Sequence, residues 1–266
     1  MEILSTKTDI GLVRDTNEDC AIAITHPKDS KIKLLIVADG MGGKSHGDIA
    51  SNYVASTISK WFLNKEPQAL NSTKKINELL IRYIKVINTN LIKKYGENVL
   101  GTTLTLALIN RSNTIILNSG DSRCYIYQEN KLTQITEDQS AVWDYHKYGG
   151  VSKDDLRYFA NNNVISSCIG LFSDFCHIES KIIKNNYQII MLFTDGVTDL
   201  ITDKKIKQLI KKSKKEELLN NIVYEAVHVN QYLFVPARLK KSYLGEYITP
   251  FKGRDNATGA IYIKDV

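Results

Sequence analysis

The chain has 266 residues, of which 43% are hydrophobic, and carries a net charge of +6. This length can bury one substantial core, so we expect a single domain over residues 1–266. The four cysteines show no Cys-x-x-Cys spacing, which argues against a structural zinc site or a disulfide framework and favours a reducing, cytoplasmic setting. No apolar run approaches the ~18 residues of a membrane span and no basic leader opens the sequence, so we expect a soluble protein.

Nine short apolar segments are typical of β-strands. They are residues 2–8, 20–26, 31–38, 102–110, 114–119, 123–128, 175–183, 187–193 and 257–263. Apolar residues recur every three or four positions over 48–62, 74–94 and 216–227, which predicts three helices with one buried face each. The lysine-rich stretch 204–215 contains no aromatic residue, and its apolar stripe predicts a surface helix rather than a nucleic-acid interface.

Turn chemistry suggests how these strands are paired. Residues 110–113 and 184–186 have the composition of turns that join neighbouring strands antiparallel. Taken alone, Gly120-Asp121-Ser122-Arg123 is also an ordinary hairpin turn. Many antiparallel strands with a few separate helices predict an α+β fold of two stacked sheets covered by helices.

Four acidic segments, residues 17–19, 39–43, 194–196 and 254–256, each end or follow an apolar run. Carboxylates at strand ends are a common source of oxygen ligands for hard divalent cations. The glycines after Asp39 could expose further carbonyl ligands, although a plain glycine turn explains them equally well. The sequence therefore predicts a metal centre, and with it an enzyme.

Two further features are ambiguous when taken singly. Arg14 precedes Glu18 and Asp19, and a guanidinium suits phosphate recognition, but such residues in a loop are usually a weak surface pair. Asp195 and Asp199 could form a carboxylate pair one helical turn apart, whereas an acid at a helix N-terminus explains Asp199 as well.

The order of the segments resembles the metal-dependent Ser/Thr protein phosphatases of the PPM (type 2C) family, especially its bacterial members. The resemblance covers almost the whole chain. It rests on seven ordered motifs: Arg14…Glu18-Asp19, Asp39-Gly40-Met41-Gly42-Gly43, Gly101-Thr102-Thr103, Gly120-Asp121-Ser122-Arg123, Thr136…Asp138…Ser140, Thr194-Asp195-Gly196…Asp199 and Asp255-Asn256.

The resemblance implies an αββα sandwich with a binuclear Mn²⁺ or Mg²⁺ centre at one end of the two sheets. By motif, Asp39 would bridge both metals, and Asp195 and Asp255 would complete one metal site. Glu18 and the Gly40 carbonyl would serve the other site. The implied reaction is hydrolysis of phosphoserine or phosphothreonine by a water that bridges the metals, without a side-chain nucleophile.

The remaining motif residues would act around this centre. The resemblance implies that Asp19 orients a metal-bound water and that Arg14 clamps the substrate phosphate. Asp121 and Asp199 would help to bind a third, weaker metal ion.

The chain also departs from the family pattern. Met41 stands where many eukaryotic relatives have a histidine proposed to protonate the leaving group, although bacterial relatives commonly carry Met there. Gln139 and Ser167 replace residues of the family pattern beside a mobile flap, here about 143–163. We expect these replacements to affect substrate affinity or flap position more than the chemistry. The connection 228–252 is longer than usual and is either a variable excursion packing its aromatic residues on the sandwich or a docking surface.

The expected partners are a phosphorylated Ser/Thr protein substrate and a cognate kinase, with no nucleic acid or membrane, and we expect a monomer. Two alternatives remain open. One is a catalytically silent relative that acts as a binding module, which the intact Asp39, Asp195 and Asp255 disfavour. The other is a phosphatase dedicated to a single phosphoprotein in a partner switch.

Overall fold

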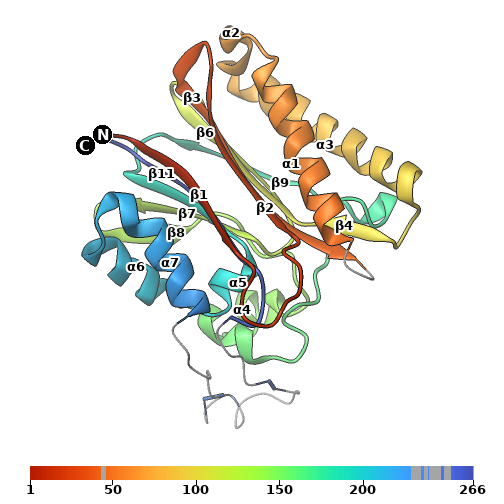
Figure 1. The fold of residues 1–266 in the computed structure, drawn as a ribbon, viewed down its shortest axis with the longest axis vertical. Coiled ribbons are helices and arrows are strands. Elements are labelled where there is room, and N and C mark those ends of the chain that lie inside the picture. The colour runs from red at the N-terminus through yellow and green to blue at the C-terminus, as the bar shows by residue number, and fades with distance from the viewer. Residues whose placement is uncertain (43–45, 229–234, 237–238, 240–246, 249–252, 266) are drawn as a thin grey trace.

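Two antiparallel sheets lie face to face between two layers of helices in the computed structural model (Figure 1). The structure describes residues 1–42, 46–228, 235–236, 239, 247–248 and 253–265. This is the α+β sandwich that the sequence predicts. No helix in these described ranges is long and apolar enough to cross a membrane.

The first sheet has five strands and the second has six. In spatial order the first contains β1 (Ile3–Asp9), β11 (Ala257–Ile263), β10 (Ile189–Phe193), β7 (Arg123–Gln128) and β8 (Lys131–Gln134). The second contains β2 (Asp19–His26), β3 (Asp29–Gly42), β5 (Leu104–Ile109), β6 (Asn113–Ser119) and β9 (Glu179–Lys184), with β4 (Leu100–Thr102) paired to the end of β3.

The helices divide between the outer faces of the two sheets (Figure 1). Over the second sheet lie α1 (Gly47–Leu63), α2 (Pro67–Leu70) and α3 (Thr73–Tyr95). On the side of the first sheet lie α5 (Asp195–Thr198), α6 (Asp203–Lys212) and α7 (Leu218–Val227). Shorter elements are α4 (Trp143–Lys147) and the 3-10 turns η1 (Lys153–Tyr158), η2 (Ser173–Phe175) and η3 (Lys215–Glu217).

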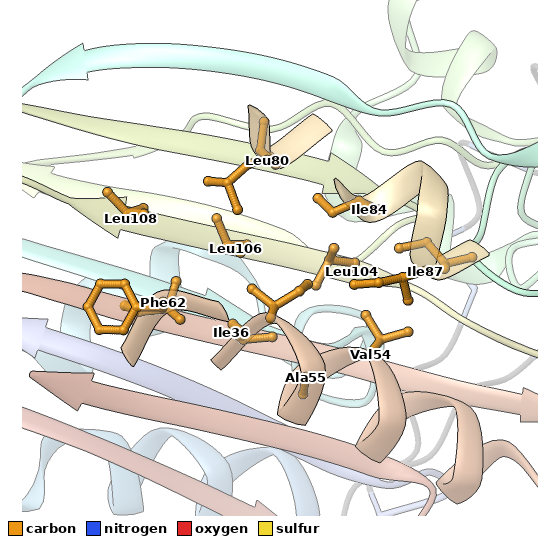
Figure 2. Packing of buried hydrophobic residues seen from close by; sticks show 14 of the residues in the cluster. Ile36, Val54, Ala55, Phe62, Leu80, Ile84, Ile87, Leu104, Leu106 and Leu108 are labelled. Atoms are coloured by element: carbon orange, nitrogen blue, oxygen red, sulfur yellow. The ribbon is translucent and has the colours of Figure 1, made fainter. Parts of the chain in front are cut away.

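Three apolar layers hold the sandwich together, and they explain why β3 has an unbroken apolar run from Leu34 to Ala38. Leu34 and Ile36 pack under the helices, whereas Leu35 and Val37 pack between the sheets. A strand buried on both faces has no polar face, so its sequence does not alternate. Figure 2 shows the helix-facing layer, where Phe62 of α1 and side chains of α3 lie over those of β3 and β5.

Most predicted elements are confirmed, but two of the turn predictions are wrong. Residues 110–113 do join β5 and β6 antiparallel. Residues 184–186, however, lead from β9 in one sheet to β10 in the other, and 120–122 likewise lead from β6 to β7. Turn composition predicts that the chain reverses direction at these two positions, but it does not predict which sheet the next strand joins.

The element boundaries differ in a few further places. The predicted strand 102–110 is divided into β4 and β5, and the predicted strand 175–183 begins only at Glu179. Strand β8 was not predicted, because its four residues are partly or fully exposed and lack an apolar run. In the connection 228–252, the described Tyr247 packs on Phe159 of the flap rather than on the sheets; the other aromatic residues of that segment lie outside the described ranges.

Strand register brings the acidic segments together. Asp19 at the start of β2 pairs directly with Asp39 near the end of β3. Because β10 and β11 run antiparallel, Thr194 at the end of β10 bonds Thr258 near the start of β11. The ends of β3 and β10 and the starts of β2 and β11 therefore meet at one end of the sandwich. This end lies beside α5 and the loop that joins β1 to β2 (Figure 1).

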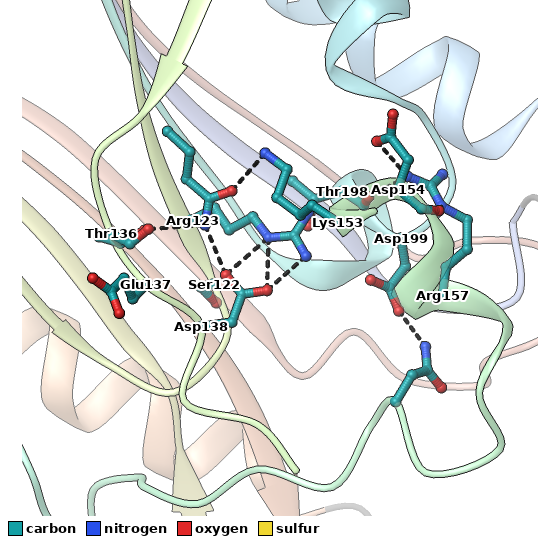
Figure 3. A network of polar contacts seen from close by, with 12 residues as sticks. Ser122, Arg123, Thr136, Glu137, Asp138, Lys153, Asp154, Arg157, Thr198 and Asp199 are labelled. Atoms are coloured by element: carbon teal, nitrogen blue, oxygen red, sulfur yellow. Dashed lines mark hydrogen bonds and ion pairs between the residues drawn. The ribbon is translucent and has the colours of Figure 1, made fainter. Parts of the chain in front are cut away.

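A buried ion pair fixes the segment that follows β8 (Figure 3). The Arg123 guanidinium donates to Asp138 at 2.8 and 2.6 Å, and both side chains are less than a tenth exposed. Gln134 Nε2 also donates to Asp138 Oδ1 at 2.8 Å. These bonds satisfy the buried charges and hold the segment 134–138 against β7.

Removing one member of this pair should destabilise the fold strongly. We expect Asp138→Ala to lower the free energy of unfolding by about 3 to 5 kcal/mol, because it leaves Arg123 buried without its partner. Urea unfolding of the metal-free protein measures this loss. The control is Glu66→Ala, which breaks a pair with Lys28 in which both side chains are more than half exposed, and which should cost less than about 1 kcal/mol. Equal losses in the two variants would contradict the assignment.

Candidate functional site

A cavity of about 300 Å³ lies where the acidic strand ends meet. Its wall combines five carboxylates with one guanidinium. The residues in its wall are Arg14, Glu18, Asp39, Gly40, Met41, Gly42, Thr103, Asp121, Asn163, Ile165, Asp195, Asp255 and Asn256. Among the wall residues in the described part of the chain, Arg14 is the only cation.

The structure brings the residues predicted for the site together, with two of them outside the cavity wall. Asp19 lies beside Asp39 as its strand partner and is only 8% exposed. Asp199 lines a small adjoining hollow of about 10 Å³ together with Asp121 and Asp195. The alternative that Asp199 is an acid at a helix N-terminus is wrong, because Asp195 is the first residue of α5 and Asp199 caps its C-terminal end. Gly43 lies outside the described residues.

The backbone of Asp39 is held by two threonines at the junction of β4 and β5. Its N–H donates to Thr103 Oγ1 at 2.9 Å, and its carbonyl accepts from Thr103 N at 2.8 Å and from Thr102 Oγ1 at 2.9 Å. These bonds leave the carboxylate free to face the cavity. They give a structural reason for the Gly101-Thr102-Thr103 motif, whose role the sequence does not reveal.

Glycine is required beside Asp39 by close backbone approach. A Cβ atom on Gly40 would lie 2.2 Å from the Gly47 carbonyl oxygen and 2.5 Å from the Glu18 carbonyl oxygen. Glu18 Oε1 in turn accepts from Gly47 N at 2.9 Å, at the start of α1. Sequence analysis missed Gly47, because its contact with Gly40 depends on how α1 packs against the end of β3.

Asn256 secures the loop that carries Arg14. Its Oδ1 accepts from Glu18 N at 2.9 Å, and its Nδ2 donates to the carbonyls of Ile10 and Thr16 at 2.9 and 3.0 Å. Arg14 donates to the Asp255 carboxylate at 2.9 Å. About half of the Arg14 side chain is exposed, so this ion pair is weak and the guanidinium is available to a ligand.

The carboxylates disfavour one another's ionisation. Desolvation, and then the charge of Asp19 and Asp195, raises the pKa of Asp39 well above its usual range. The pKa of Asp195 is likewise raised by desolvation and by Asp121 and Asp255. Burial is the main cause that raises the pKa of Asp19 to about 7 and of Asp121 to about 7. Such mutual repulsion makes the cavity favourable for cations.

The same groups fit hard divalent ions by chemistry. Asp195 Oδ1 is buried and has no hydrogen-bond partner in the structure, so it can accept a metal. The available donors are carboxylate and carbonyl oxygens, which suit Mg²⁺ and Mn²⁺. Within the described ranges, no three acidic, histidine or cysteine side chains already converge as they would around an ion. The cavity has room for water, which Mg²⁺ retains as ligand.

The two departures beside the flap have structural roles outside the cavity. Gln139 Oε1 accepts from Gly120 N at 2.9 Å and so supports the loop that carries Asp121. Ser167 Oγ shares a hydrogen bond with Ser119 Oγ at 2.8 Å and accepts from His177 N. Met41, by contrast, lies in the cavity wall, where its thioether has no proton to give.

The flap contributes residues to the site that sequence analysis did not single out. Asn162 Nδ2 donates to Asp199 Oδ2 at 2.5 Å, and Asn163 and Ile165 lie in the cavity wall. Arg254 also approaches Asp199 at 3.5 Å. No local pattern marks Asn162 and Asn163, because their positions depend on how the flap contacts Asp199 and the cavity.

Comparison with known proteins gives a consistent assignment. The family described as protein phosphatase 2C matches residues 14–224. The serine/threonine phosphatase stp of Listeria welshimeri is 31% identical over 217 residues, which cover 77% of this chain and 81% of that protein.

Solved structures agree in fold. The serine/threonine phosphatase Stp1 from Staphylococcus aureus is 26% identical, with a TM-score of 0.81 over 100% of this chain and 96% of that chain. The catalytic domain of the phosphatase PstP, in complex with two manganese ions, is 22% identical, with a TM-score of 0.72 over 98% of this chain and 97% of that chain. The chain therefore belongs to the protein phosphatase 2C family, and it is an enzyme of that metal-dependent serine/threonine phosphatase class.

Proposed function

We propose that the acidic cavity is the site at which the enzyme hydrolyses phosphoserine and phosphothreonine in proteins, with two Mn²⁺ or Mg²⁺ ions as cofactors. The observation that carries this proposal is the cavity wall itself, in which five carboxylates face a single arginine. Such a wall attracts divalent cations, and those cations with Arg14 attract a phosphate. The PstP catalytic domain, which shares the fold, is known with two manganese ions.

The ligands divide into two groups that share Asp39. Asp195 and Asp255 are two of the carboxylates that raise the pKa of Asp39, and we assign them to one ion. Glu18 and the Gly40 carbonyl belong to the other, since Gly40 N bonds the Glu18 carbonyl. When bound, two such ions lower the pKa of a coordinated water and offset the charge on the phosphoryl group.

The remaining residues would bind the substrate phosphate, orient a water and hold a third ion. Arg14 exchanges its weak pair with Asp255 for the substrate phosphate, to which a guanidinium can donate two bonds. Asp19 accepts from Thr194 Oγ1 at 2.9 Å, and as the strand partner of Asp39 it would orient a metal-bound water. Asp121 and Asp199 face the adjoining hollow, where we place a third, weaker ion.

The proposed setting follows from the chemistry of the substrate. A phosphoprotein phosphatase reverses the work of a Ser/Thr kinase, so we propose a cognate kinase in the same compartment. All four cysteines are unpaired thiols, which suits the reducing cytoplasm.

Metal binding should stabilise the chelator-treated protein. We expect Mn²⁺ at a hundred times its dissociation constant to add about 2.7 kcal/mol to the free energy of unfolding, because it neutralises the clustered carboxylates. Thermal unfolding with and without Mn²⁺ measures the shift. Asp39→Asn should lose most of it, whereas Glu78→Gln on the exposed face of α3 should keep it. A full shift in Asp39→Asn would place the ion elsewhere.

Turnover should require the two strand-end carboxylates. We expect Asp39→Asn and Asp195→Asn each to abolish metal-dependent hydrolysis of a phosphothreonine peptide and of para-nitrophenyl phosphate, with the fold intact by circular dichroism. The neutral amide keeps the shape of the side chain but removes the charge that holds the ions. Activity within a few-fold of wild type in either variant would refute the site assignment.

Arg14→Ala should act mainly on phosphate binding. Loss of a charge-assisted hydrogen bond costs about 1.5 to 3 kcal/mol, which corresponds to a rise in KM of roughly 10- to 150-fold. Steady-state kinetics and inhibition by inorganic phosphate measure it. Arg111→Ala, which removes a half-exposed guanidinium from its ion pair with Asp29, is the matched control and should leave both constants unchanged. A fall in kcat at constant KM would mean that Arg14 does not bind the ground-state phosphate.

A further inference from the structure

The flap has a small apolar core of its own, separate from the three layers of the sandwich. Its buried members are Val142, Val151, Leu156, Phe159 and Leu239, with Trp143, Tyr158, Val235 and Tyr247 packed around them. In the part of the chain that the structure describes, none of these residues belongs to either sheet. They come from only two stretches, the flap and the long connection that precedes β11. The connection therefore completes the core of the flap.

The contact between the two stretches is specific. The rings of Phe159 and Tyr247 lie 5.2 Å apart between centroids, and the two residues form an antiparallel bridge. Ile248 N donates to the Tyr158 carbonyl at 2.8 Å. Tyr247 Oη donates to the Leu239 carbonyl at 3.0 Å. Tyr145 stacks on the Phe159 ring at 5.0 Å.

Phe159 is linked to the acidic cavity by a short path. Its carbonyl accepts from Asn162 N at 3.2 Å, and Asn162 Nδ2 donates to Asp199. The next residue, Asn163, lies in the cavity wall. A displacement of Phe159 would therefore move the flap residues that face the substrate.

Polar bonds from Lys153 and Arg157, which are labelled in Figure 3, also hold this segment. Lys153 Nζ donates to Asp203 Oδ2 at 2.5 Å and to Gln134 Oε1 at 2.7 Å. Arg157 is buried and donates to the carbonyls of Thr198 and Ile201 at 3.4 and 3.5 Å. These bonds tie η1 to the body of the enzyme, but they do not contact Phe159. The outer side of the flap is supported by Tyr247 and Leu239.

We propose that Tyr247 and Leu239 brace Phe159, and that this brace positions Asn162 and Asn163 for the binding of phosphoprotein substrates. Tyr247 is then a positioning residue, which acts through Phe159 and does not touch the reacting atoms. The inference rests on the proposed function of the cavity. It predicts that the brace affects large substrates, which contact the flap, more than small ones, which occupy only the cavity.

The test uses the Mn²⁺-loaded enzyme and two independent readouts. In Tyr247→Ala we expect peptides covering residues 148–163 to exchange amide hydrogens several-fold faster, and peptides of β5 to exchange as in wild type. The KM for a phosphothreonine protein should rise about 2- to 10-fold, in line with the loss of an aromatic pair. The kcat for para-nitrophenyl phosphate should stay within about twofold of wild type.

Two variants serve as controls. Tyr247→Phe keeps the ring that packs on Phe159 but removes the hydrogen bond to Leu239, so it should change both readouts much less than Tyr247→Ala does. Tyr224→Ala removes an exposed aromatic residue of α7, outside the flap core, and should leave both unchanged. If Tyr247→Ala fails to fold, Phe159→Leu keeps most of the apolar volume while removing the ring contact, and the same changes are expected.

The outcomes separate the brace from the proposed function. Unchanged exchange over 148–163 in a folded Tyr247→Ala would overturn the brace. Faster exchange with an unchanged KM for the phosphoprotein would overturn its role in substrate binding. Absence of turnover in the wild-type enzyme on every phosphorylated substrate would instead count against the proposed function, and the exchange data would still decide whether Tyr247 holds the flap.

Discussion

The site depends on one electrostatic constraint, which is that strand register forces several carboxylates around a single cavity. Desolvation raises the pKa of Asp39 and of Asp195, and the charges of nearby carboxylates raise it further. Among the described wall residues only Arg14 opposes this charge. The burial of apolar side chains in the three layers of the sandwich must therefore offset this repulsion when the chain folds. Under the proposed function, cations would relieve this repulsion, so that metal binding and folding would be coupled.

Precision in this site comes from the backbone ladder rather than from side-chain packing. Asp39 lies on a strand buried on both faces, and Thr102 and Thr103 fix its peptide groups. A slip of one residue would turn Asp39 away from the cavity and every apolar side chain of β3 to the wrong layer. The apolar pattern that stabilises the sandwich therefore also sets the positions of the carboxylates. Gly40 and Gly47 add a steric condition, since any side chain there would separate α1 from the end of β3.

Features that depend on neighbouring residues can be predicted from the sequence, whereas contacts between segments far apart in the chain cannot. Apolar runs that end in Asp39 and Asp195 were sufficient to predict strand ends with carboxylates, and the order of motifs identified the family. Residues 120–122 and 184–186 have the composition of tight turns, yet they connect different sheets, because sheet membership depends on which strands pack together. Likewise, the contact of Asn162 with Asp199 has no signature in either segment.

The flap is held by a different kind of interaction from the cavity, and this has a functional consequence. Ladder hydrogen bonds, repeated along several strands, keep Asp19 and Asp39 in place, whereas a few side-chain bonds and the packing of Phe159 against Tyr145 and Tyr247 hold the flap. An aromatic pair contributes about 0.5 to 1.5 kcal/mol, and a hydrogen bond from a charged donor such as Lys153 or Arg157 contributes about 1.5 to 3 kcal/mol, so the position of the flap depends on a small number of contacts. The departures at Gln139 and Ser167 lie at the base of this flap and not in the cavity wall. Under the proposed function, changes at these two positions would act on substrate affinity or flap position more than on the chemistry.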